Sequence, residues 1–219
     1  MSRESVKAAW YWLARLACRM FCAMTFRFRM VGRENIPERG PFILASNHQS
    51  YLDPVFCGVA AKRHLVFMAR DSLFRFRPFG WLIHSVSAIP IGRDKADVTA
   101  MKKILARLKE GRGVCLFPEG TRTPDGRIVA FKPGLGLLCR RSKATVVPVL
   151  IDGAFECWPR HKRFFSPGPI VVWFGKPLLP EHIRPMSNQD LADHLTDTLR
   201  QMQQDCRVKQ GKKPFDYGA

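Results

Sequence analysis

The segment NHQSYLDP, residues 47–54, places a histidine and an aspartate five positions apart, with a proline directly after the aspartate. His48 and Asp53 could not share one face of a helix, because neighbours on a helix surface are three or four residues apart. The Asp-Pro pair is typical of a helix start, so we expect a strand, a turn and then a helix from about Asp53. A compact turn could bring the Asp53 carboxylate to one imidazole nitrogen and leave the other nitrogen as a general base. In the alternative interpretation, Asp53 only caps the helix and His48 is a polar loop residue.

The sequence offers no convincing nucleophile to accompany this pair. Ser46 and Ser50 flank the histidine, but the G-x-S-x-G sequence of a nucleophile elbow is absent. We therefore expect His48 to activate a hydroxyl group that belongs to the substrate.

A second stretch, VCLFPEGTRTPDG, has the residue types of an anion site. Gly120 lets the backbone turn and approach a ligand closely, and the fork of donors on Arg122 matches phosphate. The Glu119 carboxylate could hold Arg122 or another basic group in place. The other interpretation is an ordinary strand exit with a surface ion pair. A third stretch, SAIPIGRD, leads to Arg93, and strands ending in arginine and histidine favour one crevice at the edge of an α/β sheet.

The elements that must position these residues alternate between short apolar runs and helical patterns. Consecutive apolar residues indicate strands buried on both faces. The alternation predicts an α/β domain with a mixed, largely parallel β-sheet flanked by helices. Ser187 and Asp190 resemble a capping box for the last helix. The expected strands are 42–47, 65–69, 87–91, 114–119, 145–152 and 170–175, and the expected helices are 54–62, 73–84, 95–110, 134–141 and 188–206.

The net charge of +18 implies an acidic partner, because 36 lysines and arginines stand against only 18 acidic residues. Nucleic acid, an anionic membrane and a phosphorylated substrate would each suit such a chain. The sequence has no zinc-finger or aromatic RNA-binding signature, so nucleic acid is the weaker candidate. The seven cysteines form no C-x-x-C pair, which argues against a zinc site, and their odd number fits a reducing, cytosolic compartment.

The N-terminal stretch is rich in apolar residues, but Arg15 and Arg19 fall in its middle. A transmembrane helix needs about 20 nearly uncharged residues, so we expect an amphipathic helix at a membrane surface. Lys7 joins the two arginines in a basic stripe at helical spacing. The alternative is a helix docked on its own domain with the arginines facing water. The residues expected at the membrane are Trp10, Trp12, Arg15, Leu16, Arg19 and Met20.

The stretches NHQSYLD, SAIPIGR, FPEGTRT and VVPVLIDG resemble the four ordered motifs of the glycerolipid acyltransferases, most closely the 1-acylglycerol-3-phosphate acyltransferases. The resemblance runs from about residue 31 to residue 180, and H-x-x-x-x-D followed by F-P-E-G-T-R is a highly specific pair. It implies that His48 is the base, that Asp53 orients it, and that Pro148 is linked to acyl-donor binding and packing. The residues expected to bind the acceptor phosphate are Arg70, Arg93, Glu119, Gly120, Thr121 and Arg122.

One position departs from the family's pattern. The sequence MARDSL places Arg70 where the family often has a lysine, and Ser72 where it often has a glutamate. Arginine keeps the positive charge but offers a planar fork in place of a point charge. A lyso-aminolipid or another lysophospholipid is therefore an alternative acceptor.

The resemblance implies a peripheral enzyme at the cytoplasmic face of the cell membrane. Its expected reaction moves an acyl chain from acyl-coenzyme A or acyl-carrier protein to the sn-2 hydroxyl of 1-acylglycerol 3-phosphate, giving phosphatidic acid. We expect no metal, no cofactor and no nucleic-acid partner. The expected parts of the chain are a membrane-associating helix over 1–30, an acyltransferase domain over 31–208 and a flexible tail over 209–219.

Overall fold

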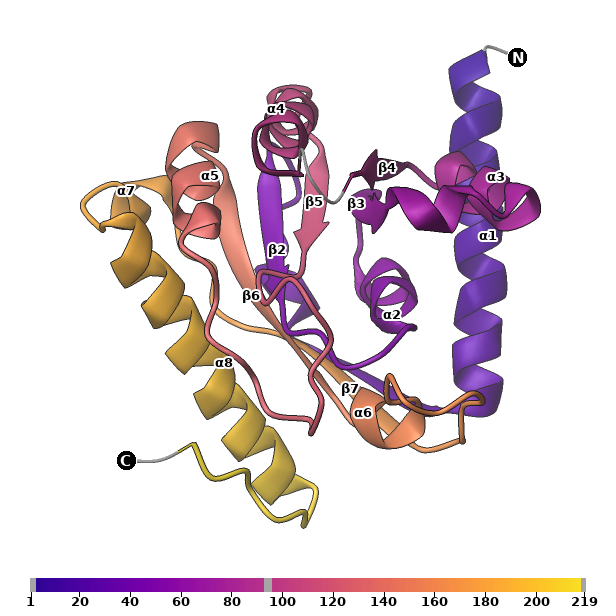
Figure 1. Ribbon diagram of the computed structural model, residues 1–219, viewed down its shortest axis with the longest axis vertical. Helices are drawn as coiled ribbons and strands as arrows, with labels where there is room; N and C mark the ends of the chain where they lie inside the picture. Colours follow the sequence, from indigo (N-terminus) through magenta and orange to yellow (C-terminus); the bar gives the residue numbers. More distant parts are fainter. Residues whose placement is uncertain (1–2, 93–95, 218–219) are drawn as a thin grey trace.

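A single sheet organises the molecule. The computed structural model describes residues 3–92 and 96–217, and within them the strands form a seven-stranded sheet in the order β1-β7-β6-β2-β5-β3-β4 (Figure 1). All neighbouring strands are parallel except β6 and β7. The sheet is therefore mixed and largely parallel, as the sequence predicted. Its strands are β1 (Arg27–Val31), β2 (Phe42–Ser46), β3 (Leu65–Arg70), β4 (Ala88–Ile91), β5 (Gly113–Leu116), β6 (Thr145–Asp152) and β7 (Pro169–Phe174).

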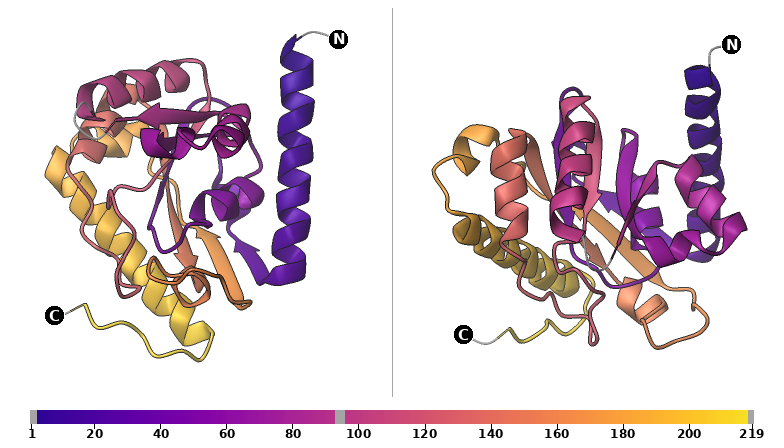
Figure 2. Two further views of the ribbon diagram at one scale, coloured as in Figure 1. Left: turned by 45° about the vertical axis from the view of Figure 1, so that its right-hand side comes forward. Right: turned by 45° about the horizontal axis from the view of Figure 1, so that its top comes forward.

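Helices cover both faces of this sheet (Figure 2). Phe42 and Leu44 of β2 pack in a core shared with α1 and α2, whereas Ile43 and Ala45 pack in a second core shared with α4, α5 and α8. This burial on two sides explains why the strands are apolar at consecutive positions. The helices are α1 (Arg3–Thr25), η1 (Arg33–Asn35), α2 (Asp53–Ala60), η2 (Asp71–Phe74), α3 (Arg77–Ser85), α4 (Ala96–Lys109), α5 (Gly134–Ser142), α6 (Ala154–Cys157), α7 (Pro180–Ile183) and α8 (Asn188–Lys209).

The six strands expected from the sequence are confirmed, and β1 is one that the sequence did not predict. Its sequence RFRMV was hidden in the basic, apolar N-terminal stretch, and only pairing with β7 at the sheet edge makes it a strand. The helix expected over 73–84 is two short helices, because Pro78 occupies the first turn of a new helix, α3. The capping box of Ser187 and Asp190 is confirmed at the start of α8.

Helix α1 packs on the domain with the side that carries Tyr11 and Arg15. Tyr11 is buried, and its hydroxyl accepts a hydrogen bond of 3.3 Å from the backbone N–H of Leu65. The last carbonyl groups of a helix lack partners within the helix, and a cation there is favourable. Arg15 supplies this cation to α2, so it faces the domain and not the membrane surface for which the sequence predicted it. It donates to the carbonyl oxygens of Gly58 (3.0 Å), Val59 (3.1 Å) and Ala61.

The opposite side of α1 is apolar and exposed. Trp12, Leu16 and Met20 are 45%, 54% and 57% exposed, and Arg19 beside them is also exposed. Trp10 instead is half-buried, and its indole N–H donates to the Ser85 hydroxyl of α3 at 2.9 Å. The helix is therefore docked on its own domain, through a side that combines Tyr11 and Arg15 with the buried Cys22 and the partly buried Cys18 and Phe21. In the described part of the chain, no helix has the length and apolar character needed to cross a membrane.

Phe215 and Tyr217, which follow α8, pack beside the loop that follows β5. The Tyr217 hydroxyl accepts a hydrogen bond of 2.9 Å from the backbone N–H of Ile128 and contacts Gln203 of α8. The Phe215 ring lies close to Gly126 of the same loop. The sequence predicted a flexible tail over 209–219. In the structure α8 continues to Lys209, and Phe215 and Tyr217 make these contacts, while residues 218–219 lie outside the described residues.

We expect Arg15→Ala to lower the free energy of unfolding by about 1–2 kcal/mol, because hydrogen bonds from a charged donor to half-buried carbonyl groups are lost. Denaturant unfolding measures this difference. Arg19→Ala is the matched control, since Arg19 lies one turn further along α1, is exposed, and should change stability by no more than about 0.5 kcal/mol. Equal losses in the two variants would contradict the capping role of Arg15.

Candidate active site

The polar motifs meet at one edge of the sheet. Strands β2, β5, β3 and β4 are parallel neighbours, so their carboxyl ends lie side by side. The segment with His48 follows β2, the segment with Glu119 follows β5, and Arg70 ends β3. Crevices at this edge are the usual binding sites of open α/β sheets. The crevice predicted from the sequence is thus consistent with the strand order.

A buried carboxylate orients the histidine. Oδ2 of Asp53 lies 2.7 Å from Nδ1 of His48 and also accepts the backbone N–H groups of Gln49 (2.5 Å) and Ser50 (2.7 Å). Asp53 is fully buried, whereas the His48 side chain is 20% exposed. A neutral imidazole that donates from Nδ1 to the carboxylate presents Nε2 as its proton acceptor. Leu52, and not Asp53, is the N-cap of α2, so the interpretation of Asp53 as only a helix cap is wrong.

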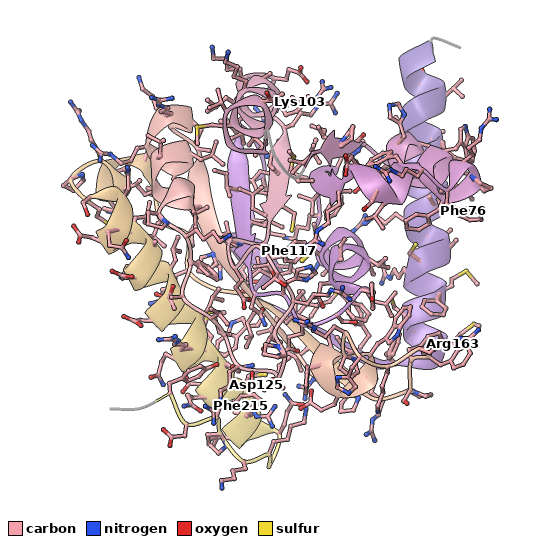
Figure 3. All side chains as sticks on the ribbon, viewed as in Figure 1. Phe76, Lys103, Phe117, Asp125, Arg163 and Phe215 are labelled. Carbon is pink, nitrogen blue, oxygen red and sulfur yellow. The ribbon has the colours of Figure 1, made fainter. Side chains whose placement is uncertain are left out.

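The backbone of His48 is held on both sides by the loop that follows β5. Its N–H donates to Oε1 of Glu119 at 2.7 Å, and its carbonyl oxygen accepts the N–H of Thr123 at 2.8 Å. The imidazole stacks on the ring of Phe117, with 4.2 Å between the ring centroids. Phe117 lies near the centre of the molecule, beyond the end of β5 (Figure 3). The two motifs therefore fix both the position and the plane of the histidine ring.

Glu119 is a buried acid that binds backbone, not arginine. Its second oxygen, Oε2, accepts the N–H of Val129 at 3.2 Å, and the residue is only 4% exposed. Burial raises the pKa of Glu119 to about 8, although the hydrogen bonds from the backbone of His48 and Val129 act in the opposite direction. No ion pair joins Glu119 to Arg122 among the described residues. The sequence placed Glu119 in the phosphate site, whereas the structure places its carboxylate under the histidine loop.

Arg122 is held by an aromatic ring. Its guanidinium carbon lies 3.6 Å from the centroid of the Tyr51 ring, a cation–π contact, and its Nη1 is buried without a hydrogen-bond partner in the described structure. An unpaired buried donor is costly, so this nitrogen is suited to an anion that reaches the loop. Gly120 nearby has φ of +73°, and a β-carbon on it would come within 2.9 Å of Nζ of Lys132. A side chain at position 120 is therefore disfavoured by the backbone conformation, whereas the end of the flexible Lys132 side chain could move away from it.

The segment VVPVLIDG is tied to the histidine segment by amide side chains. Asn47 exchanges two hydrogen bonds with the backbone of Ile151, of 2.9 Å and 2.7 Å. Gln49 donates to the carbonyl of Gly126 and accepts the N–H of Phe155, each at 3.2 Å. Pro148 is buried within β6, where it pairs with Ala45 of β2. This position fits the packing role expected for Pro148.

The remaining predicted site residues are spread along the edge. Arg70 and Thr121 are exposed, and the side chain of neither makes a hydrogen bond or ion pair with another described residue. Arg93 lies outside the described residues. Sequence reasoning missed the roles of Asn47, Gln49 and Tyr51, although each stands inside or beside the quoted motif. The available signal was the run of polar residues at the end of an apolar strand, where buried polar groups need partners.

Glu119→Gln should change how stability depends on pH. Because the pKa of Glu119 in the folded protein, about 8, lies above its ordinary value of 4.5, folding takes up a proton between these values. Its contribution to stability is complete below about pH 4.5 and is lost as the pH rises through about 8. The Tm of the variant relative to wild type should therefore increase from about pH 5 to about pH 9. Glu181→Gln on α7, which is exposed, controls for the loss of one charge, and a constant Tm difference for Glu119→Gln would contradict the assignment.

Comparisons with known proteins place the chain in a family. Residues 27–152, more than half of the chain, match the family model described as Acyltransferase. The chain is 26% identical over 189 residues to the 1-acyl-sn-glycerol-3-phosphate acyltransferase of Bacillus subtilis, covering 86% of the chain and 89% of that protein. It is 27% identical over 172 residues to the chloroplastic LPAT1 of Arabidopsis thaliana, covering 77% of the chain and 48% of that protein. The chain thus spans about half the length of this plant relative.

A solved structure has the same fold. The crystal structure of the 1-acyl-sn-glycerophosphate acyltransferase PlsC from Thermotoga maritima superposes with a TM-score of 0.82 at 24% identity, covering 92% of this chain and 81% of that one. The family match includes β2 and the His48 segment that follows it, the Asp53 helix start and the Arg122 loop. The chain described here belongs to the acyltransferase family.

Proposed function

We propose that this protein transfers an acyl chain from an acyl thioester to the sn-2 hydroxyl of 1-acylglycerol 3-phosphate. The observation that carries the proposal is the contact between His48 and the buried Asp53 at the end of β2. Family membership and the names of the relatives support the reaction class. Acyl-coenzyme A and acyl-carrier protein are both suited as donors, since each presents negative charge to a chain of net charge +18.

The proposed mechanism uses His48 as a general base. Nε2 takes the proton of the acceptor hydroxyl while the hydroxyl oxygen forms a bond to the thioester carbonyl carbon. Asp53 stabilises the imidazolium that results, because its carboxylate faces Nδ1. As the tetrahedral intermediate collapses, the carbon–sulfur bond breaks, and the imidazolium returns its proton to the leaving thiolate. The chemistry of these steps can be carried by the protein's own side chains.

The acceptor phosphate is proposed to bind at Arg122, whose buried Nη1 lacks a partner among the described residues. Gly120 allows close approach of the phosphate, and Arg70 at the end of β3 adds charge along the same edge. Lys132, which lies against Gly120, is a further cation beside this site. Because Arg70 replaces the lysine often found in this family, another lysophospholipid or a lyso-aminolipid is the second candidate acceptor.

The exposed apolar side of α1 supports a peripheral position at a membrane surface, and we propose that this surface is the cytoplasmic face. A soluble protein gains by burying apolar side chains, and α1 buries Tyr11 and Cys22 but leaves Leu16 and Met20 more than half exposed. An interfacial helix buries an apolar face of this kind about 5–10 Å into the headgroup boundary. The lysolipid acceptor would then lie in the surface that α1 contacts.

His48→Ala should lower kcat by at least about 10²–10⁴-fold, because the base is lost. Asp53→Asn should cause a similarly severe loss, because it favours the wrong imidazole tautomer. The measurement is acyl transfer from labelled acyl-coenzyme A to lysophosphatidic acid, with circular dichroism to verify folding. His182→Ala on α7 is the control, since this histidine is exposed and far along the chain from the site. A His48→Ala protein that keeps half of the wild-type rate would refute the base assignment.

Arg122→Ala should raise KM for the acceptor by about 10–100-fold and leave KM for the donor nearly unchanged, because a charge-assisted contact is lost. Tyr51→Leu should produce a smaller shift in the same direction, since Tyr51 only holds the guanidinium. Tyr51→Phe keeps the ring and should behave as wild type. Arg127→Ala, on the same loop but exposed, is the control. Equal effects on both substrates would instead indicate that Arg122 serves the loop structure.

A further inference from the structure

A basic cleft lies between the end of α1 and strand β1. It has a volume of about 500 Å³ and is lined by Arg19 and Ala23 of α1 and by residues 26–30. Arg27 and Arg29 come from β1, where they alternate with Phe28 and Met30. Three of the seven residues that line this cleft are therefore arginines, and the others are apolar.

Within residues 3–92 and 96–217, the side chains of the three arginines of this cleft have no partner. No acidic residue occurs between Glu4 and Glu34 in the sequence. Two other arginines of the same region are engaged: Arg15 binds carbonyl groups at the end of α2, and Arg33 donates to the Ala60 carbonyl at 2.9 Å. For Arg19, Arg27 and Arg29 the described structure contains no side-chain hydrogen bond, ion pair or ring contact. Clustered, exposed and unpaired arginines are suited to phosphate, which their planar forks match.

The cleft adjoins the apolar side of α1. Arg19 and Ala23 lie on the flank of the helix that also exposes Leu16, Met20 and Met24, the last of which is 81% exposed. A second basic and aromatic segment, residues 160–165, lies next to it, because Phe165 contacts Phe26 with 5.9 Å between ring centroids. In Figure 3, Arg163 of this segment lies beside the C-terminal end of α1. Positive and apolar groups are therefore adjacent over a continuous surface.

The strand directions place this surface at the edge of the sheet that holds the active site. β1 is parallel to β7, β7 is antiparallel to β6, and β6 is parallel to β2. The start of β1, at Arg27, therefore lies at the same edge as the end of β2, which leads to His48. β1 is three strands away from β2 in the sheet, or about 15 Å. The cleft is thus separate from the site proposed for the acceptor phosphate but opens toward the same side of the molecule.

We propose that the cleft formed by Arg19, Arg27 and Arg29 binds the phosphate of an anionic membrane phospholipid whose acyl chains lie along the apolar side of α1. The lipid is a component of the bilayer and not the lipid that is acylated. This inference extends the membrane association given under the proposed function. It adds a binding site for a lipid headgroup to the proposed membrane contact of α1. It also explains why β1 carries arginine at exposed positions. A bilayer lipid is favoured over the acyl donor because the cleft borders Leu16 and Met20, which are exposed and apolar.

The test is co-sedimentation of the full chain with vesicles of phosphatidylcholine alone and of phosphatidylcholine with phosphatidylglycerol. The triple variant R19Q/R27Q/R29Q should bind the anionic vesicles about 100-fold more weakly at low salt. This follows from about fivefold, or about 1 kcal/mol, for each basic residue near an anionic surface. Binding to neutral vesicles should be unchanged. The triple variant R19K/R27K/R29K should recover only part of the affinity, because lysine restores the charge without the fork.

The control is R140Q/R141Q/R184Q, which removes the same charge from exposed arginines of α5 and the end of α7, across the molecule from α1 (Figure 1). Its affinity for anionic vesicles should fall by no more than about threefold, since these charges lie beyond a Debye length from the bound surface. If the control and the cleft variant lose equal affinity for anionic vesicles, or if the lysine variant recovers all of it, binding depends only on the overall positive charge. Either result would overturn the headgroup site. A raised KM for soluble acyl-coenzyme A with unchanged vesicle binding would assign the cleft to the donor and overturn it as well.

Two further measurements separate this inference from the proposed reaction. Transfer to a short-chain, water-soluble acceptor should be unchanged in R19Q/R27Q/R29Q, because these arginines are three strands away from His48. Replacing Leu16 and Met20 by serine should weaken binding to neutral and anionic vesicles alike. If the serine variant loses membrane binding while the arginine variant keeps it, α1 is the anchor and the headgroup site is refuted. An inactive wild-type protein that still shows the arginine dependence would refute the reaction but not the site.

Discussion

The buried Asp53 carboxylate is the constraint on which the local structure depends. It accepts three hydrogen bonds through one oxygen, from the His48 ring and from two backbone N–H groups, and these bonds define the turn between β2 and α2. The same residue is the first of α2, so the orientation of that helix and the orientation of the imidazole are linked. The other end of α2 is held by Arg15 and Arg33, which bind its last carbonyl groups. A helix of eight residues is thus fixed at one end by the site and at the other by the N-terminal region.

The histidine is positioned mainly through its backbone. Glu119 and Thr123 bind the N–H and the carbonyl oxygen of His48. The side chain of Asn47, the residue before His48, binds the backbone of Ile151 in β6. These contacts require β5 and β6 to lie on either side of β2, which is the order seen in the sheet. Motifs that are distant in sequence therefore form one structure because they follow neighbouring parallel strands. The raised pKa of Glu119 is the electrostatic consequence of burying an acid to hold this loop.

A series of ring contacts runs from the site to α1. The Arg122 guanidinium lies over Tyr51, the Tyr51 ring lies 5.1 Å from that of Trp158, and Trp158 contacts Phe165 at 5.8 Å. Phe165 in turn contacts Phe21 of α1 at 5.8 Å. The proposed phosphate residue and the proposed membrane helix are therefore parts of one packed surface. This arrangement suits the proposed reaction, whose acceptor would lie in the membrane. If α1 binds the membrane surface, these contacts fix the position of Arg122 relative to that surface.

The sequence by itself determined the fold class, six of the seven strands and the site motifs, because those depend on local patterns. Buried strands are apolar at consecutive positions, and a His-to-Asp spacing that ends in Asp-Pro requires a turn before a helix. Only the tertiary structure decided what depends on partners distant in the chain. β1 is a strand because β7 is beside it, Glu119 binds the His48 backbone because β5 adjoins β2, and Arg15 faces inward because the end of α2 needs donors. Helical spacing shows which residues of α1 share a side. Which side faces the domain depends also on the backbone groups of the domain that need hydrogen-bond partners, such as the carbonyl groups at the end of α2.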